Sequence, residues 1–145
     1  RVLDRLARRL AQATAQAGTK TPHDKLLALA QAYLAFTHEN PRLWDLLFEH
    51  RLPAGQDLPA WYMEKLATLL AQIETTLDPF FRPEDTQAKV RSARVLWSAV
   101  HGITSLSTSG KLSIITTQAA GELAEDLVRT YLAGLGGRRK MRAKA

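Results

Sequence analysis

The sequence predicts an all-α protein built as an orthogonal bundle of about six helices. Apolar residues recur every three to four positions along most of the chain, as they do on the buried face of an amphipathic helix. No segment between turn signals shows the apolar–polar alternation of a half-buried strand. The prolines, at positions 22, 41, 53, 59, 79 and 83, fall between the periodic segments and mark their ends. A length of 145 residues suits one domain with a core of its own.

The first half of the chain predicts three helices. Residues 1–17 place leucines at positions 3, 6 and 10 on one face and arginines on the opposite face. Residues 22–40 follow Thr21, a residue type typical of an N-cap, and begin with a proline at the first helical position. Asn40-Pro41 is expected to cap a short third helix that is rich in aromatic residues.

The remaining chain predicts three further helices. The fourth covers residues 59–77 and is ended by Asp78-Pro79. The fifth covers residues 83–108, and the sixth covers residues 113–133. The turn Ser109-Gly110-Lys111 joins these last two helices.

The last two predicted helices are rich in small and apolar residues. Gly102 stands in the middle of the fifth helix, where glycine costs about 1 kcal/mol relative to alanine. The sixth helix is apolar on more than one side, so most of its surface should be buried. Two arrangements account for this: an isologous homodimer through a four-helix interface, or one protomer core in which these helices are central. The residues predicted to form the dimer interface are Val100, Ile103, Leu106, Ala119, Ala120, Leu123 and Leu127.

The net charge of +6 is concentrated at the two ends of the chain. Basic residues at positions 138, 139, 140, 142 and 144 follow three glycines, and we expect residues 136–145 to be a basic, flexible tail. Residues 1–135 carry no basic face of the size that a nucleic-acid-binding domain uses. We therefore expect no DNA binding by this part of the chain alone.

Composition also excludes several classes of protein. The absence of cysteine excludes a disulfide framework, a zinc–thiolate site and a cysteine nucleophile, and it fits a reducing, cytoplasmic location. No apolar run approaches the roughly 18 residues that a membrane span requires, so we expect no membrane association.

No catalytic or metal-binding constellation stands out. The histidines, at positions 23, 38, 50 and 101, show none of the spacings of a helical zinc site, so we predict no metal. A nucleophile elbow, a phosphate-binding glycine loop and a dinucleotide fingerprint are all absent from the sequence, and we predict no cofactor and no enzyme activity. A cofactor-independent enzyme with His101 as the base is the weakest alternative, because no second titratable group shares its helical face.

Aromatic residues are distributed over four consecutive predicted helices. Trp97 and His101 are four residues apart, so they lie on one face of the fifth helix. If the aromatic faces converge, they line an apolar chamber with few polar groups, which is typical of a small-molecule site. The alternative is an ordinary packed core. The candidate ligand-binding residues are Tyr33, Phe36, Trp44, Leu47, Phe48, Tyr62, Leu66, Trp97 and His101.

One stretch of the sequence resembles a known family. The run Leu96-Trp97-Ser98-Ala99-Val100-His101-Gly102-Ile103-Thr104-Ser105-Leu106, followed by Ser109-Gly110-Lys111-Leu112, resembles a Trp-x-x-x-His-Gly signature. This signature is found in one type of C-terminal domain of the tetracycline-repressor-like (TetR/AcrR) transcriptional regulators. The helix order is similar over residues 1–135.

The resemblance implies an effector-binding and dimerisation domain. Regulators of this family carry an N-terminal helix-turn-helix that reads operator DNA, and this sequence lacks one, so residues 1–17 would connect the domain to it. The family implies a homodimer through the fifth and sixth helices and a small hydrophobic effector among the second to fifth, with His101 as a polar contact. Effector binding would then shift the protein away from its DNA-binding state. A ligand-free helical adaptor or dimerisation module remains the alternative.

Overall fold

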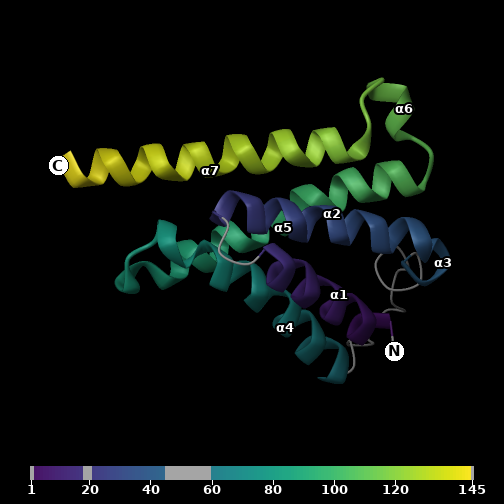
Figure 1. The fold of residues 1–145 in the computed structure, drawn as a ribbon, viewed down its shortest axis with the longest axis horizontal. Helices are drawn as coiled ribbons and strands as arrows, with labels where there is room; N and C mark the ends of the chain where they lie inside the picture. The colour runs from purple at the N-terminus through teal and green to yellow at the C-terminus, as the bar shows by residue number, and fades with distance from the viewer. Residues whose placement is uncertain (1, 18–20, 45–59, 145) are drawn as a thin grey trace, which may run out of the picture.

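A computed structural model describes residues 2–17, 21–44 and 60–144 of the chain (Figure 1). All regular structure in these residues is helical, which confirms the predicted all-α bundle. The long helices are α1 (Val2–Ala17), α2 (Pro22–Glu39), α4 (Ala60–Leu77), α5 (Thr86–Thr108) and α7 (Ala120–Lys144). The short helices are α3 (Pro41–Trp44), the 3-10 turns η2 (Asp78–Phe80) and η3 (Pro83–Asp85), and α6 (Leu112–Ile115).

Helix α2 is the central element of the bundle. It contacts α1, α4, α5 and α7, and its buried face includes Leu26, Leu29, Tyr33 and Phe36. The predicted N-cap is confirmed, because the backbone N–H of Asp24 donates to the Thr21 hydroxyl over 3.2 Å. The helix therefore begins at the residue that the sequence indicates.

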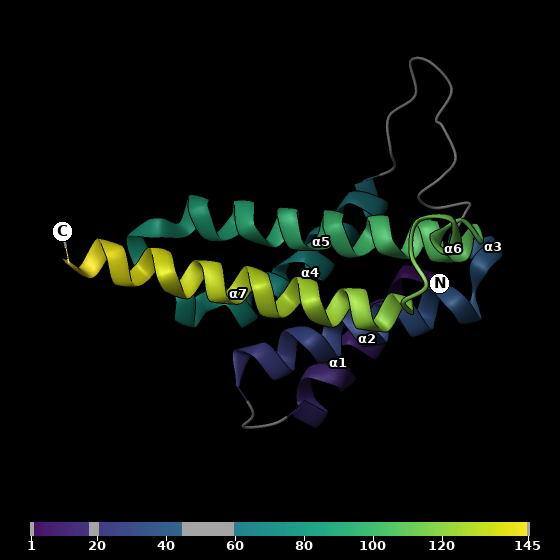
Figure 2. The ribbon, with the colours of Figure 1, turned by 90° about the horizontal axis from the view of Figure 1, so that it is seen from above.

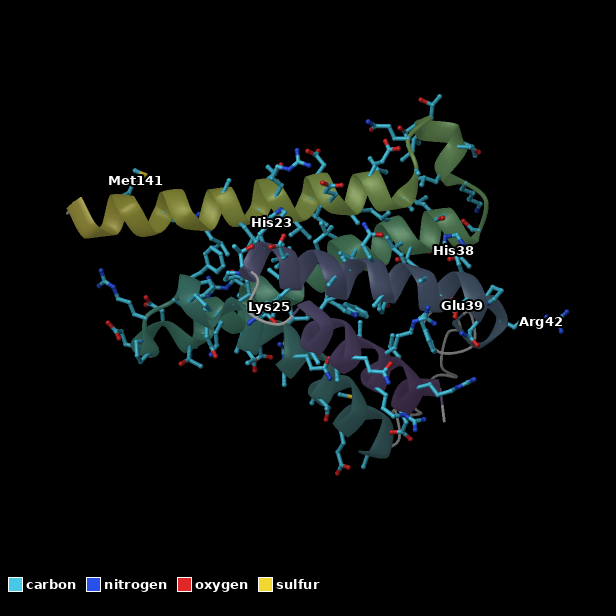
Figure 3. All side chains as sticks on the ribbon, viewed as in Figure 1. His23, Lys25, His38, Glu39, Arg42 and Met141 are labelled. Atoms are coloured by element: carbon cyan, nitrogen blue, oxygen red, sulfur yellow. The ribbon has the colours of Figure 1, made fainter. Side chains whose placement is uncertain are left out.

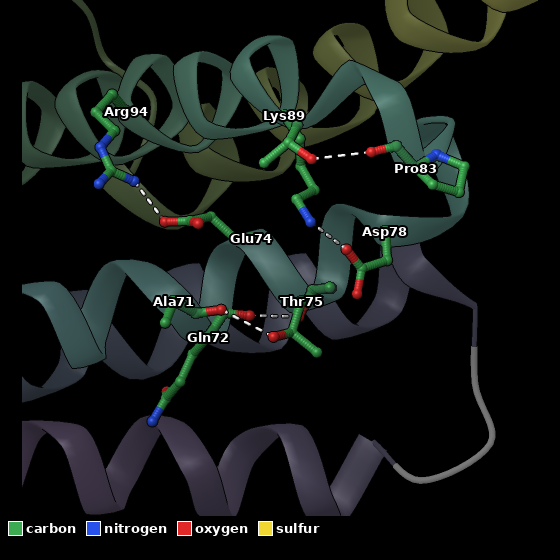
Figure 4. A network of polar contacts seen from close by, with 10 residues as sticks. Ala71, Gln72, Glu74, Thr75, Asp78, Pro83, Lys89 and Arg94 are labelled. Atoms are coloured by element: carbon green, nitrogen blue, oxygen red, sulfur yellow. Dashed lines mark hydrogen bonds and ion pairs between the residues drawn. The ribbon is translucent and has the colours of Figure 1, made fainter.

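Helices α4 and α5 are joined by η2 and η3, and one ion pair links α5 to α4 while a second links α5 to η2 (Figure 4). Arg94 donates to Glu74 over 2.6 Å, and Lys89 donates to Asp78 over 2.7 Å. Such partly exposed pairs contribute about 0–1 kcal/mol each, so they orient the two helices more than they stabilise them. The stabilisation comes from apolar burial between the helices.

Helices α5 and α7 run antiparallel and side by side (Figure 2). A Schellman motif ends α5: Lys111 N–H donates to the carbonyl of Leu106 over 2.9 Å, and Gly110 N–H donates to that of Ser107 over 3.1 Å. Gly110 has a φ of 74°, a conformation that favours glycine. The predicted turn at residues 109–111 is therefore confirmed.

The prediction of one unbroken sixth helix over residues 113–133 is wrong. Helix α6 ends at Ile115, and Thr116 adopts an extended conformation with φ −157° and ψ 155°. The Thr116 hydroxyl accepts a hydrogen bond from the backbone N–H of Gln118 over 3.1 Å. β-Branched residues from Ile114 to Thr117 disfavour the helix, and the threonine hydroxyl competes for backbone groups, so α7 begins only at Ala120.

The predicted helix end near residue 133 is also wrong, while the flexibility of residues 136–145 stays a prediction. Helix α7 continues through Gly134, Gly136 and Gly137 to Lys144. Leu132 and Leu135 are buried, which anchors the helix beyond the point where the glycines begin.

None of the helices in the described ranges combines the length and the apolar character needed to cross a bilayer.

Candidate ligand-binding site

A small apolar cavity lies where the long helices meet. Its volume is about 40 Å³. Helix α2 supplies four of its lining residues, α5 supplies three and α4 two, and α1 and α7 contribute one residue each. The lining residues are Leu10, Leu26, Leu29, Ala30, Tyr33, Leu69, Ile73, Leu96, Trp97, Val100 and Val128.

Mostly buried side chains form the wall of the cavity. Its lining side chains are buried except Ile73 and Trp97, which are partly exposed. Aliphatic side chains and the rings of Tyr33 and Trp97 form a wall that is almost wholly apolar. A hydrophobic molecule is therefore the kind of ligand that the wall matches.

Tyr33, Trp97 and His101 form a cluster at the side of the cavity next to α5. The Tyr33 hydroxyl lies 3.4 Å from Nδ1 of His101, and it donates to that nitrogen when Nδ1 carries no proton. The rings of Trp97 and His101 stack with centroids 4.9 Å apart and an interplanar angle of 29°. The i, i+4 spacing on α5 and the central position of α2 bring the three side chains together.

The structure places the sequence-predicted ligand residues in three groups. Tyr33 and Trp97 line the cavity, and His101 contacts both of them. Phe36 is buried in the core one turn beyond Tyr33 and is not a lining residue. The side chains of Trp44, Tyr62 and Leu66, and all of Leu47 and Phe48, lie outside the described part of the chain.

Most of the aliphatic wall was not predicted as part of the site. Leu26, Ala30 and Tyr33 follow helical spacing on α2, so the predicted apolar face contains the signal for that side. Leu10 and Val128 carry no such signal, because nothing in the sequence says that α1 and α7 meet the same cavity. The position of these two residues in the cavity wall depends on tertiary packing.

The predicted dimer residues occupy different environments within the protomer. Val100 is 8% exposed and lines the cavity, so its side chain packs inside the protomer. Ile103, Ala120 and Leu127 are partly buried and pack against the core. Leu106 and Leu123 are also partly buried, and Ala119 is exposed.

A Cβ atom on Gly102 would meet nothing within 4 Å in the protomer. This glycine therefore serves no close helix contact inside the described part of the chain.

The cavity is too small for an effector in the conformation described here. Small-molecule pockets usually measure about 300–1,000 Å³, whereas this one measures about 40 Å³. A single water molecule needs roughly 10–15 Å³ of this kind of volume, so the cavity has room for a few waters at most. A larger occupant requires the surrounding helices to separate.

An ion pair links α1 to the end of α2. Arg9 donates two hydrogen bonds to the carboxylate of Glu39, one of them from Nη2 to Oε1 over 3.0 Å. Glu39 stands in the last turn of α2 (Figure 3). The hydrogen bond from Arg9 lowers the pKa of Glu39 below its ordinary value, and the carboxylate raises the pKa of Arg9. Helix α1 is thus tied to α2 by a charged pair as well as by apolar packing.

Comparison with known proteins identifies the family. The family model described as "Tetracyclin repressor-like, C-terminal domain" matches residues 26–131, which extend from the first turns of α2 well into α7. None of the curated proteins compared with the chain matches it. The Trp-His-Gly subtype indicated by the sequence stays a prediction. Because the matched segment covers most of the chain and contains the cavity helices α2, α4 and α5, the protein belongs to the tetracyclin repressor-like C-terminal domain family.

Proposed function

We propose that the chain is the effector-binding and dimerisation domain of a tetracycline-repressor-like transcriptional regulator. It binds a small hydrophobic molecule between α1, α2, α4, α5 and α7 and transmits the binding event through α1. The operator-reading domain would precede residue 1, and the regulator would act in the cytoplasm. Membership of the family and the position of the cavity support this proposal.

The observation that carries the proposal is the presence of Leu10 in the cavity wall. Leu10 is 3% exposed and belongs to α1, the helix that would connect to a DNA-binding domain. A ligand that enlarges the cavity must push against α1 as well as against the other helices. A bulky ligand in the cavity would therefore displace α1, the connecting helix.

The effector's relative affinities for the compact and the expanded state decide which of the two states it favours. A cavity of about 40 Å³ cannot hold a bulky effector, so such an effector binds only the expanded state. It shifts the population towards that state by as much as its affinities for the two states differ. Displacement of α1 would then change the spacing of two DNA-binding domains in a dimer.

Dimerisation through α5 and α7 is supported by the surface that the protomer leaves uncovered. Ile114 and Ile115 of α6 are 77% and 68% exposed, and they follow directly on the end of α5. A second copy of the chain packed against this end of α5 and α7 would cover both isoleucines.

The test of the cavity uses the neutral fluorescent probe N-phenyl-1-naphthylamine. We expect the chain to bind this probe with an increase in its fluorescence. Ala30→Leu places extra methyl groups in the cavity and should weaken binding at least tenfold. Ala71→Leu, on an exposed position of α4, is the matched control and should bind as the unsubstituted chain does.

The small cavity also supports a second candidate function, the ligand-free helical adaptor or dimerisation module. Equal probe affinity in Ala30→Leu and in the unsubstituted chain would contradict binding in the cavity. No binding in either protein, together with an intact dimer, would favour the adaptor.

A further inference from the structure

A second and larger pocket lies between α7 and the segment that joins α4 to α5. Its volume is about 290 Å³, close to the roughly 300 Å³ at which small-molecule sites begin. It is separated from the apolar cavity, because the two share no lining residue. The residues that give it its chemistry are Phe81, Arg82, Asp85, Arg91, Tyr131 and Arg138.

The pocket is cationic. Three guanidinium groups line it, those of Arg82, Arg91 and Arg138, against the single carboxylate of Asp85. None of these three arginines forms an ion pair with another residue whose side chain is described.

Two other arginines, on the same helices α5 and α7, are paired with carboxylates. Arg94 on α5 is paired with Glu74, and Arg129 on α7 is paired with Glu125. Guanidinium groups bind carboxylates in a planar, two-bond arrangement, so uncommitted arginines around one hollow favour an anionic ligand.

The uncharged part of the wall combines the aromatic rings of Phe80, Phe81 and Tyr131 with the smaller side chains of Ala88, Ser92, Val95 and Leu135. The Phe81 and Tyr131 rings are partly buried and pack against the core, so their positions are fixed by the fold. Ring faces and edges favour a flat apolar body over a hydrated ion. A free inorganic anion would leave these walls unused.

We propose that this pocket binds a small aromatic carboxylate, whose anionic group is held by Arg91 and Arg138 and whose ring packs on Phe81 and Tyr131. The site is distinct from the apolar cavity and does not depend on it. Both η2 and α5 contact α7, so a ligand here bridges the end of the α4–α5 segment and the last helix.

The experiment measures binding of 2-naphthoate to the chain by isothermal titration calorimetry, with the neutral 2-naphthalenemethanol as the matched ligand. We expect 2-naphthoate to bind at least tenfold more tightly than the alcohol. Arg91→Gln and Arg138→Gln should each weaken 2-naphthoate at least tenfold and leave the alcohol unchanged. Arg129→Gln removes the same charge from the exposed face of α7 outside the pocket and should bind as the unsubstituted chain does.

Three results would overturn the proposal. The first is no binding of 2-naphthoate at millimolar concentration, and the second is equal affinity for the acid and the alcohol. The third is an equal loss in Arg129→Gln, which would show attraction by overall charge only. Ala30→Leu separates the two sites, because it should block the neutral probe in the apolar cavity and leave 2-naphthoate binding intact.

Discussion

His101 is the candidate site residue whose surroundings the structure defines most closely. Its ring is stacked on Trp97, and its Nδ1 faces the Tyr33 hydroxyl, so its orientation is set by two lining residues of the cavity. The polar end of an effector that enters between α2 and α5 would meet this pair. The hydrogen-bonding capacity of His101 should therefore contribute to affinity only for ligands that carry a polar group.

We expect His101→Phe to weaken 2-naphthol binding and to leave naphthalene binding unchanged. One net hydrogen bond is worth about 0.5–1.5 kcal/mol, which corresponds to roughly a 2- to 10-fold loss of affinity. Equilibrium titration of both ligands provides the measurement, and the dimer should stay intact. His38→Phe is the control, because His38 lies next to Ser107 at the far end of α2. An unchanged affinity for 2-naphthol would remove His101 from the site.

The aromatic side of the cavity was predictable from the sequence, and most of the aliphatic side was not. Trp97 and His101 were predictable because their spacing places them on one helix face, and Tyr33 because it lies on the apolar face of its helix. Leu10 and Val128 were not, since their place in the wall depends on how α1 and α7 pack against α2. A periodic pattern identifies a buried face, but it does not identify the helix that covers this face.

At the scale of elements, the link between α1 and α2 is sensitive to pH. The pKa of Glu39 is lowered in the folded chain, so the ion pair with Arg9 stabilises the fold above the ordinary pKa of about 4.5. This contribution is lost as the pH falls through the lowered pKa. The same acidification should loosen α1 from α2.

We expect Glu39→Gln to be less stable than the unsubstituted chain at pH 7 and equally stable at acidic pH. Denaturant unfolding between pH 7 and pH 3 should show the difference in free energy shrinking below about pH 4.5. Glu64→Gln, on an exposed position of α4, is the control. A difference that stays constant with pH would mean that the carboxylate charge of Glu39 contributes nothing to the fold.

The ends of the helices were predictable where a single residue decides them. Thr21 and Gly110 act through one cap and one turn, and both are found where the sequence places them. The break at Thr116 and the continuation of α7 past Gly134 depend on competing weak preferences. Apolar packing decides the continuation of α7, and local helix propensities carry no information about such packing.

At the scale of the whole molecule, a substitution at Gly102 tests the proposed dimer. An added Cβ finds open space in the protomer, so Gly102→Ala should stabilise the single chain by up to about 1 kcal/mol through helix propensity. If a partner's helix occupies that space, the same methyl group should weaken the dimer at least tenfold. The two effects have opposite signs, which makes them separable.

Native mass spectrometry provides the measurement, with a dimer expected near twice 16.1 kDa. Gly136→Ala is the matched control, because its Cβ also meets nothing in the protomer and its position lies outside the predicted interface. A dimer that tolerates Gly102→Ala as well as Gly136→Ala would place the interface elsewhere. A monomeric unsubstituted chain at micromolar concentration would contradict the dimer altogether.

The small volume of the apolar cavity has a kinetic consequence. A ligand cannot enter until the helices part, so the frequency of their opening limits how fast binding can proceed. The observed association rate should rise with ligand concentration and then reach a plateau that is the same for chemically different ligands. Ligands that bind with different strength would then differ mainly in how long they stay. In the proposed regulator, the packing of α1 against α2 and α4 would thus make the duration of a signal, more than its onset, the property that a ligand's structure controls.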